Sequence, residues 1–433
     1  GNTKATVDAD AKFAWTAGDN IAVHVSNGTS HKYVLTSDTG ASGASSVSGA
    51  SASFTVVYED GYARDAFAVF PASIVATDAT NYGQSGQTLD VTLPDTYALS
   101  AVSDTKTPCP MIAANTGSGW TFKQLCGLLR LTVKAIPSDA TGLVIQFPGK
   151  KVNGDFSVTD FSTATPYIPV GGTPADGEDK ITVTFTAGTA TERTLNIPLP
   201  AGSYDDVYIT PTGGSTKVAA VRHIKAGGYT AARAHGKQLT VTLVSFSVSA
   251  SKKVVFAPGN LQYIGSASPA YWKFADHQYD YLGTTTGQNS ADAGKDRDLF
   301  GWGTKTNPAN TSTTNGDYTW NEWGDNAIGS YAANTWRTLT GGDSDAYEWF
   351  YLFNTRSAST VNGTGNARFA KAYLFGTTHG IILFPDEYSH PDGVTAPTGI
   401  NATSNTSWNA NKYNEDAWAA MEAAGAVFLP AAG

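Results

Sequence analysis

Short runs in which apolar and polar residues alternate dominate the chain up to about residue 244. Over residues 12–25, KFAWTAGDNIAVHV, apolar side chains stand on both sides of a Gly18-Asp19 turn. Alternation with a period of two, interrupted by turn residues, is the signature of a β-hairpin. The first elements predicted are therefore strands.

The same pattern predicts many further strands, closed by glycine or proline turns. Residues 120–135 have the composition of a helix, but Gly127 and the β-branched Thr132 and Val133 favour a strand. Strands at intervals of 8–15 residues indicate β-sandwiches. The predicted strands cover 53–57, 66–70, 88–93, 111–113, 129–133, 143–147, 180–185, 193–197, 206–210, 217–223 and 238–243.

The pattern changes after Ser245, where helices join the strands. An acidic Asp345-x-x-Glu348 start predicts a short helix near Asp345, and Asn414 can cap a second helix over 415–424 that Gly425 stops. Strands are predicted at 254–256, 367–375, 380–384 and 427–429. The fold class is therefore mainly β, with domains at 1–118, 119–244 and an α+β region at 245–433.

Composition agrees with a globular chain outside the nucleic-acid-binding class. The 433 residues are 41% hydrophobic and 15% charged, and the formal net charge is -9 without a basic stripe. We expect no nucleic-acid partner. No run of 18 apolar residues predicts a transmembrane segment, and no signal peptide is evident. The chain reads as a mature, exported surface protein.

Two cysteines, Cys109 and Cys126, leave two alternatives open. They could form a disulfide across adjacent strands, or both could be buried thiols. Their spacing matches no metal motif.

The third region is rich in tryptophan among glycine, asparagine and aspartate. Eight of the ten Trp residues lie at or after Trp272. Amphipathic rings in turn-rich loops are typical of recognition surfaces, although a buried loop core is the alternative for each ring. The predicted ligand-binding residues are Trp302, Trp320, Trp323, Asp325, Asn326 and Trp336.

Motifs for catalysis are missing from the sequence, and we predict no catalytic residue and no resident metal or cofactor. There is no G-x-S-x-G run, and no pair of carboxylates stands out. Calcium is the one ion left as an alternative, because acidic loops supply oxygen ligands. The calcium candidates are Asp292, Asp296 and Asp298, the 323–326 run, and Asp386 and Glu387 with Asp392.

Six motifs in the first 244 residues resemble the fimbrillin-like proteins of the Bacteroidetes, the subunits of strand-exchange pili. They are WTAGDNIAV, DAFAVFP, PMIAA, FKQLCGLLRLTVKA, LPAGSYDDVYI and GKQLTVTL, in the family's order. The resemblance implies two tandem transthyretin-like β-sandwiches. It also implies export through the outer membrane as a lipoprotein, and assembly in which one subunit donates a strand to the next.

The chain departs from that pattern in two places. Its first arginine is Arg64, so no arginine precedes the first strand in this sequence. Either the processing site of the family lies upstream of this sequence, or the first strand is never removed. The donor strand would follow the second sandwich, but Ser245–Ala250 leads instead into the third region. A subunit of this kind fits the end of a filament, most naturally the tip.

The third region resembles a module that recurs in Bacteroidetes surface proteins and is similar to C-type-lectin-like folds. The resemblance rests on FAPGNLQY, WKFADHQYDYLG, DLFGWGT, GIILFPD and AGAVFLPAAG. It implies an adhesive module, although the region has no lectin-type cysteines.

Together these features predict an extracellular fimbrial subunit, a tip adhesin that is not an enzyme. Its partners would be other pilus subunits and a glycan or protein on a host or bacterial surface. The alternatives are a surface carbohydrate-active enzyme and a pilus anchor or assembly subunit. A carboxylate pair with one raised pKa in an aromatic cleft would favour the enzyme.

Overall fold

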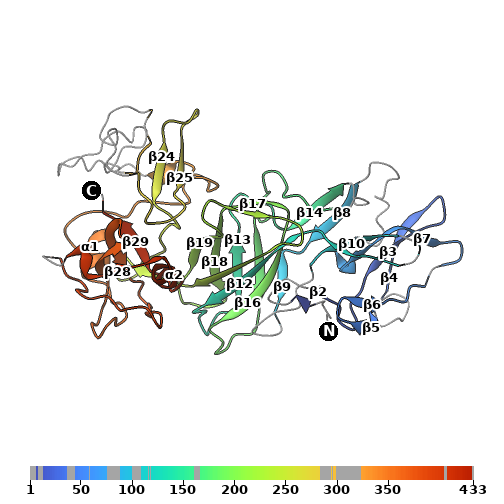
Figure 1. Cartoon of the computed structure of the whole chain (residues 1–433), viewed down its shortest axis with the longest axis horizontal. Helices are drawn as coiled ribbons and strands as arrows, with labels where there is room; N and C mark the ends of the chain where they lie inside the picture. The colour runs from blue at the N-terminus through green and yellow to red at the C-terminus, as the bar shows by residue number, and fades with distance from the viewer. Residues whose placement is uncertain are drawn as a thin grey trace. The chain divides into compact units, whose positions relative to one another are not determined.

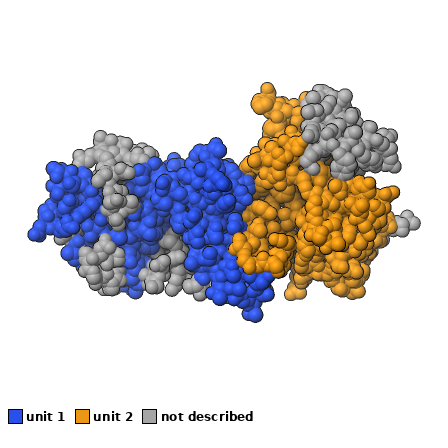
Figure 2. All heavy atoms as spheres, turned by 180° about the vertical axis from the view of Figure 1, so that it is seen from behind, with its two compact units in different colours: residues 1–204, 229–240 blue, residues 205–228, 241–433 orange. Residues whose placement is uncertain are grey.

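The computed structural model forms two compact units, residues 1–204 with 229–240 and residues 205–228 with 241–433 (Figure 2). The structure describes residues 6–7, 13–36, 44–57, 59–75, 88–99, 109–115, 117, 119–159, 166–282, 294, 296–298, 323–403 and 407–431. The three-domain division remains a prediction.

Unit 1 is built from strands (Figure 1). They are β1 (Thr6–Val7), β2 (Phe13–Ala14), β3 (Ala22–Ser26), β4 (His31–Leu35), β5 (Ser45–Ser48), β6 (Ser51–Ser53), β7 (Ala63–Phe70), β8 (Thr88–Leu93), β9 (Thr96–Ala98), β10 (Met111–Ala114), β11 (Lys123–Gln124), β12 (Gly127–Lys134), β13 (Gly142–Gln146), β14 (Gly154–Thr159), β15 (Lys180–Thr184), β16 (Arg193–Leu199), β17 (Gly202–Tyr204), β20 (Tyr229–Ala231) and most of β21 (Gly236–Thr242), with a 3-10 turn, η1, at Ala72–Ile74.

The largest sheet of unit 1 has the order β11-β10-β7-β3-β4 and is buried on both faces. Successive residues of β7 serve opposite faces, as the period of a strand requires. Phe67 and Val69 pack with β8 and β14, whereas Ala68 and Phe70 pack with Trp15. The paired strands β8 and β14 thus cover one face of this sheet, which is a sandwich arrangement.

The remaining sheets of unit 1 confirm most of the strands expected after residue 120. The predicted strand at 129–133 is the middle of β12, which pairs antiparallel with β16 along its length. β13 pairs antiparallel with β15, and the short β9 lies parallel to β15. The alternation around Thr132 and Val133 therefore outweighed the helical composition of 120–135.

Two local predictions for unit 1 are wrong. The hairpin expected over 12–25 does not form, because β2 pairs with β1 while β3 pairs with β4 and β7. The strand expected at 53–57 ends early, since β6 stops at Ser53. Phe54 instead packs edge-to-face on Trp15, with ring centroids 5.0 Å apart, so packing on the ring replaced strand pairing.

Both cysteines are free and buried, which is the thiol alternative. Burial raises the pKa of the Cys109 thiol to about 12 and raises that of Cys126 as well, with a further contribution from Cys109. Protonated, buried thiols of this kind act as small apolar core residues.

Unit 2 contains both helices of the described residues. Its elements are β18 (Asp206–Thr212), β19 (Ala220–His223), β22 (Phe246–Ser247), β23 (Lys253–Val254), β24 (Leu261–Ile264), β25 (Tyr271–Phe274), α1 (Glu348–Asn354), β26 (Phe369–Leu374), β27 (Thr378–Leu383), β28 (Lys412–Tyr413), α2 (Glu415–Ala423) and β29 (Val427–Pro430), with 3-10 turns η2 (Trp323–Asp325) and η3 (Trp408–Ala410).

A four-stranded sheet, β28-β26-β27-β29, forms the centre of unit 2 and carries one helix on each face (Figure 1). Phe369, Leu383 and Val427 face the α1 side, where they pack with Leu352. The neighbouring residues Ala370, Ile382 and Phe428 face the α2 side with Trp418 and Met421. Near-continuous apolar strands are the pattern of a sheet buried on both faces.

The ends of α2 are as predicted, whereas the start of α1 is not. Asn414 caps α2 by accepting a hydrogen bond from the Ala417 amide at 2.9 Å, and Gly425 ends it with φ at 95°. Helix α1 begins at Glu348, and the carboxylate of Asp345 accepts a hydrogen bond from the Thr355 hydroxyl instead of capping the helix. The helix therefore starts at Glu348, whose carboxylate pairs with Arg337, and not near Asp345.

A buried ion pair, Arg356–Asp386, joins the parts of unit 2 that surround the central sheet. The Arg356 side chain has no exposed surface and donates to the Asp386 carboxylate at 2.8 Å. It also donates to the backbone carbonyls of Leu352 in α1 and Phe384 after β27, at 2.8 and 2.6 Å. Asp386 accepts from the amide and hydroxyl of Ser247, so the pair also holds the segment that contains β22.

The mainly β fold class is confirmed. The transthyretin-like and C-type-lectin-like assignments stay predictions. No helix among the described residues is long and apolar enough to cross a membrane.

We predict that Gly425→Ala destabilises unit 2 by more than about 2 kcal/mol. A methyl group there would lie 2.3 Å from the Val244 side chain, and its backbone is left-handed. Gly363→Ala is the control, because its φ is 74° but nothing lies within 4 Å of its added carbon, so only roughly 1 kcal/mol is expected. Urea unfolding followed by tryptophan fluorescence measures both, and equal losses would contradict the packing argument.

We predict that Arg356→Met costs about 3–5 kcal/mol, because it leaves the Asp386 carboxylate without its buried cation. Lys253→Met is the matched control: Lys253 is 36% exposed and lies 3.1 Å from Glu387, so its loss should cost less than about 1 kcal/mol. The same urea titration tests both, and a loss at Arg356 no larger than that at Lys253 would refute the role of the buried pair.

Candidate functional site

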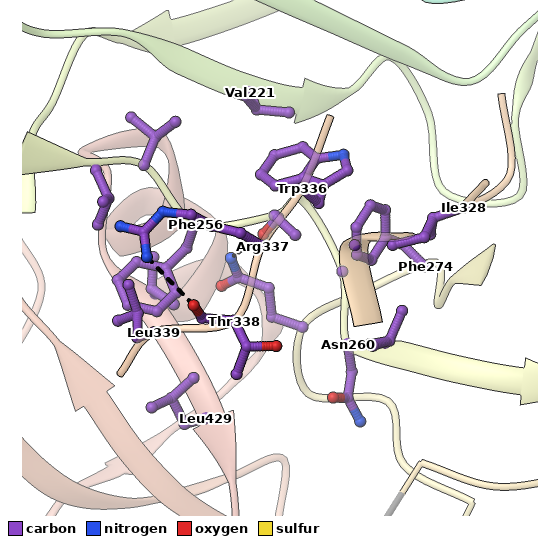
Figure 3. Close-up of a pocket in the computed structure, with 18 of the residues that line it drawn as sticks. Val221, Phe256, Asn260, Phe274, Ile328, Trp336, Arg337, Thr338, Leu339 and Leu429 are labelled. Atoms are coloured by element: carbon purple, nitrogen blue, oxygen red, sulfur yellow. Dashed lines mark hydrogen bonds between the residues drawn. The ribbon is translucent and has the colours of Figure 1, made fainter. Parts of the chain in front are cut away.

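A mostly apolar pocket of about 500 Å³ opens in unit 2 (Figure 3). The Trp336 ring, Phe274 and Ile328 line one side, and Phe256, Leu339 and Leu429 line the other. Pockets of this size that are lined by aromatic and aliphatic side chains are the usual form of small-ligand sites. It is therefore the candidate binding site.

The hairpin β24–β25 positions one wall of this pocket. Leu261 pairs with Phe274 and Tyr263 pairs with Trp272, whose rings are 5.0 Å apart. Leu261 and Phe274 are only partly buried, so part of each side chain is left to line the pocket. The 261–274 hairpin was not predicted, because its strands are short and carry large residues on both faces.

Trp336 forms the centre of the aromatic wall. Its ring meets Phe274 and Tyr331 edge-to-face, with both centroid distances at 5.3 Å. Its backbone lies so close to Gly324 that a Cβ there would overlap the Trp336 carbonyl oxygen. A glycine is thus required at position 324, where η2 approaches the backbone of Trp336. The Trp336 ring is held in place although its residue lies outside any helix or strand.

Two polar side chains of the lining, Gln278 and Arg337, are engaged by the protein itself. The Gln278 amide donates to Ala257 O and accepts from the Phe428 amide, at 3.0 and 2.9 Å. Arg337 donates twice to Glu348, at 2.6 and 2.9 Å. No Asp or Glu belongs to the lining in the described part of the chain. The pocket therefore suits an apolar or ring-shaped group more than a charged one.

The Arg337–Glu348 ion pair holds the chain segment next to Trp336 in place. The Glu348 carboxylate also accepts a hydrogen bond from the Thr340 amide at 3.0 Å and forms an ion pair with Lys252 at 2.8 Å. Burial by itself would raise the pKa of Glu348, but these hydrogen bonds and the Arg337 charge lower it to about 2. The carboxylate is thus ionised throughout the physiological range.

A His223–Asp206 pair lies close to the pocket. The His223 Nδ1 atom contacts Asp206 and its Nε2 lies 2.9 Å from the Ala275 carbonyl, which joins β19 to the end of the β24–β25 hairpin. Burial by itself would lower the pKa of His223, but the bonds to Asp206 and Ala275 raise it above its usual value. Both ring nitrogens of His223 have a partner within the protein, so we infer that this histidine has a structural role.

The structure describes only some of the predicted ligand-binding residues. Trp302, Trp320 and the side chain of Trp323 lie outside the described part. Trp336 lines the pocket, and Gly324 of η2 lines it beside Trp336. Asp325 is exposed and Asn326 is half-buried, and neither belongs to the lining. Their role in binding stays a prediction.

The calcium candidates are not brought together among the described residues. Asp386 and Glu387 are engaged with Arg356, Lys253 and Ser245. Asp298 accepts from the Leu282 amide at 2.5 Å, and Asp296 accepts from the Ser266 amide at 3.0 Å. Asp392 lines a separate polar hollow with Asp416. Asp292 lies outside the described residues.

The one described group of at least three potential metal ligands lies in unit 1. It consists of His24, His31 and Asp65, whose ligand atoms all lie within 4.8 Å of one another. No sequence motif connects these residues, which are spread over three strands.

Comparisons with known proteins give distant structural similarities. No protein-family model and no curated protein matches the chain. A candidate cell adhesion protein from Bacteroides ovatus is 14% identical, with a TM-score of 0.34, over 55% of this chain and 89% of that one. A candidate cell adhesion protein from Bacteroides fragilis is 12% identical, with a TM-score of 0.26, over 66% and 92%.

A fimbrial protein from Bacteroides ovatus is 10% identical, with a TM-score of 0.21, over 55% of this chain and 49% of that one. All three TM-scores lie below 0.5, so these similarities establish neither a shared fold nor a shared function.

We predict that His223 makes the stability of unit 2 fall as pH rises. Its folded pKa is above the unfolded value of about 6.5, so its contribution is complete below that pH and is lost as pH rises through the folded pKa. Urea unfolding between pH 5.5 and 9 should show this loss, and His223→Gln should remove it. The exposed His235→Gln is the control, and an unchanged slope in His223→Gln would disprove the linkage.

Proposed function

We propose that the chain is a cell-surface fimbrial subunit whose C-terminal region binds a ligand through the Trp336 pocket. The observation that carries the binding role is the pocket itself, with its aromatic wall and its lack of carboxylates among the described lining residues. The fimbrial role rests on the order of the six motifs in the first 244 residues and on the mainly β fold.

The chemistry of the pocket suggests what is recognised. Edge-to-face rings leave apolar faces and edges available, against which a sugar ring or an aromatic or aliphatic side chain can pack. Thr335 is exposed and Trp336 half-buried, so the lining reaches the surface of unit 2. We infer that the partner is a glycan or a protein on a host or bacterial surface.

A tip position is supported by the segment that follows the second predicted sandwich. Val244, Phe246 and Val248 are buried and pack with Leu352 and Leu383 in the core of unit 2. The two serines that alternate with these apolar residues are also held in place, because Ser245 donates a hydrogen bond to Glu387 and Ser247 donates one to Asp386. A segment used in its own core is not free to complete another subunit, which suits a subunit that ends a filament.

The rest of this proposal follows from the resemblance of the first 244 residues. Other pilus subunits would be partners through donor-strand exchange, in which an added strand pairs with an open sheet edge. The location would be an extracellular fimbrium, reached through the outer membrane as a lipoprotein.

The enzyme alternative required a carboxylate pair in an aromatic cleft, with one raised pKa. The described lining of the pocket has no carboxylate. Where the pKa of a described carboxyl group is shifted, at Glu178 and Glu348, it is lowered. We therefore favour binding over glycoside hydrolysis at this pocket.

We predict that the full chain binds a member of a glycan array or of a panel of extracellular-matrix proteins, and that Trp336→Ala weakens this binding at least about tenfold. Truncating a central aromatic residue of a binding site typically costs 2 kcal/mol or more. Thr335→Arg should weaken binding as much, because it adds a long charged side chain at an exposed lining position while the aromatic wall remains.

Trp408→Ala is the matched control, since Trp408 is also half-buried but belongs to η3 outside the pocket. Thermal unfolding checks that each variant is folded. Equal weakening by all three variants would disprove the pocket as the site. Absence of binding by the folded chain across both arrays would overturn the adhesive role and favour the anchor or assembly hypothesis.

A further inference from the structure

Three neighbouring strands of unit 1 bring two histidines and an aspartate to one point. The Nδ1 atom of His24 in β3 lies 3.3 Å from Oδ2 of Asp65 in β7, and the Nδ1 atom of His31 in β4 lies 3.2 Å from the same oxygen. We name this set the His24–His31–Asp65 cluster. It belongs to none of the elements that form the Trp336 pocket.

Strand register explains how residues so far apart in sequence share one face. His24 pairs with Tyr33 while Ser26 pairs with His31, so His24 and His31 are diagonal neighbours on the same face of the β3–β4 pair. The β3–β7 pairing shifts register between Val23 and Val25, and Asp65 lies in the shifted part of β7. Such irregularities re-aim side chains and are frequent at functional sites.

Two distances within the cluster agree with the spacing of ligand atoms around a metal ion. Ligand atoms of a tetrahedral zinc ion, bound at 2.0–2.1 Å, are separated from one another by about 3.3 Å. The separations of 3.3 and 3.2 Å from the Asp65 oxygen to His24 and His31 match this spacing, and all three ligand atoms lie within 4.8 Å of one another.

The setting of His24 also suits a metal ligand. Its side chain has no exposed surface and stacks on Phe67, with ring centroids 5.0 Å apart.

We propose that the His24–His31–Asp65 cluster binds a divalent transition-metal ion of the zinc class. Two imidazole nitrogens and one carboxylate oxygen are a common three-ligand set for zinc, with a fourth position left to water or another ligand. Asp65 is 33% exposed and His31 16%, so solvent reaches the outer side of the cluster. The ion would fasten β7, β3 and β4 together.

The test is isothermal titration of the EDTA-treated full chain with zinc chloride. We expect one zinc ion per chain, and at least tenfold weaker binding by His31→Gln and by Asp65→Asn, which change ligand atoms with little change in size. His235→Gln, at an exposed histidine of the same unit, should bind as the unaltered chain does. Circular dichroism checks that each variant is folded.

A second readout reports the geometry. Cobalt(II) in place of zinc should give the intense visible absorption of a tetrahedral site, and Asp65→Asn should remove it. Zinc should also raise the Tm of the unaltered chain but not that of His31→Gln, because binding to the folded state stabilises it. Absence of zinc binding, or equal binding by the cluster variants and the His235 control, would overturn the proposal.

Discussion

The buried contact between Arg356 and Asp386 is the interaction on which unit 2 depends. A guanidinium without exposed surface is tolerated because it makes four hydrogen bonds, to the Asp386 carboxylate and to the carbonyls of Leu352, Arg368 and Phe384. These acceptors come from α1, from the residue before β26 and from the segment after β27. One side chain therefore fixes how a helix and two strands meet.

The pocket depends on this arrangement through the elements that the pair positions. Asp386 holds Ser247, and the adjoining Phe246 packs edge-to-face on Phe256 with a centroid distance of 4.9 Å. Phe256 is part of the pocket lining. On the other side, Glu348 at the start of α1 anchors Arg337, next to Trp336. Two ion pairs at the two ends of one short helix thus support opposite walls of the same cavity.

The two candidate sites illustrate different physical uses of a β-rich chain. The Trp336 pocket collects rings from loops and a hairpin, and the lining residues Gln278 and Arg337 are engaged with protein partners. Affinity there would come from removing apolar surface from water. The His24–His31–Asp65 cluster is small, polar and built on three paired strands, whose registers hold the ligand atoms at defined separations. Rigid strands are suited to metal geometry, and aromatic loops are suited to surface recognition.

The sequence determined the local features whose causes are local. Alternation identified β12 despite its helical composition, and Asn414 and Gly425 marked both ends of α2, because a cap and a left-handed glycine act on adjacent backbone. It also singled out Trp336, which lines the pocket, since an aromatic residue in a turn-rich loop is visible in the sequence itself.

Only the tertiary structure decided which strands pair and which side chains meet. The hairpin expected over 12–25 lost to the pairing of β3 with β4 and β7, because burying both faces of a five-stranded sheet outweighs a nearby turn. Arg356 and Asp386 are 30 residues apart, and Asp65 reaches His24 only through a register shift. Such contacts depend on long-range packing, which leaves no pattern in the sequence around either partner.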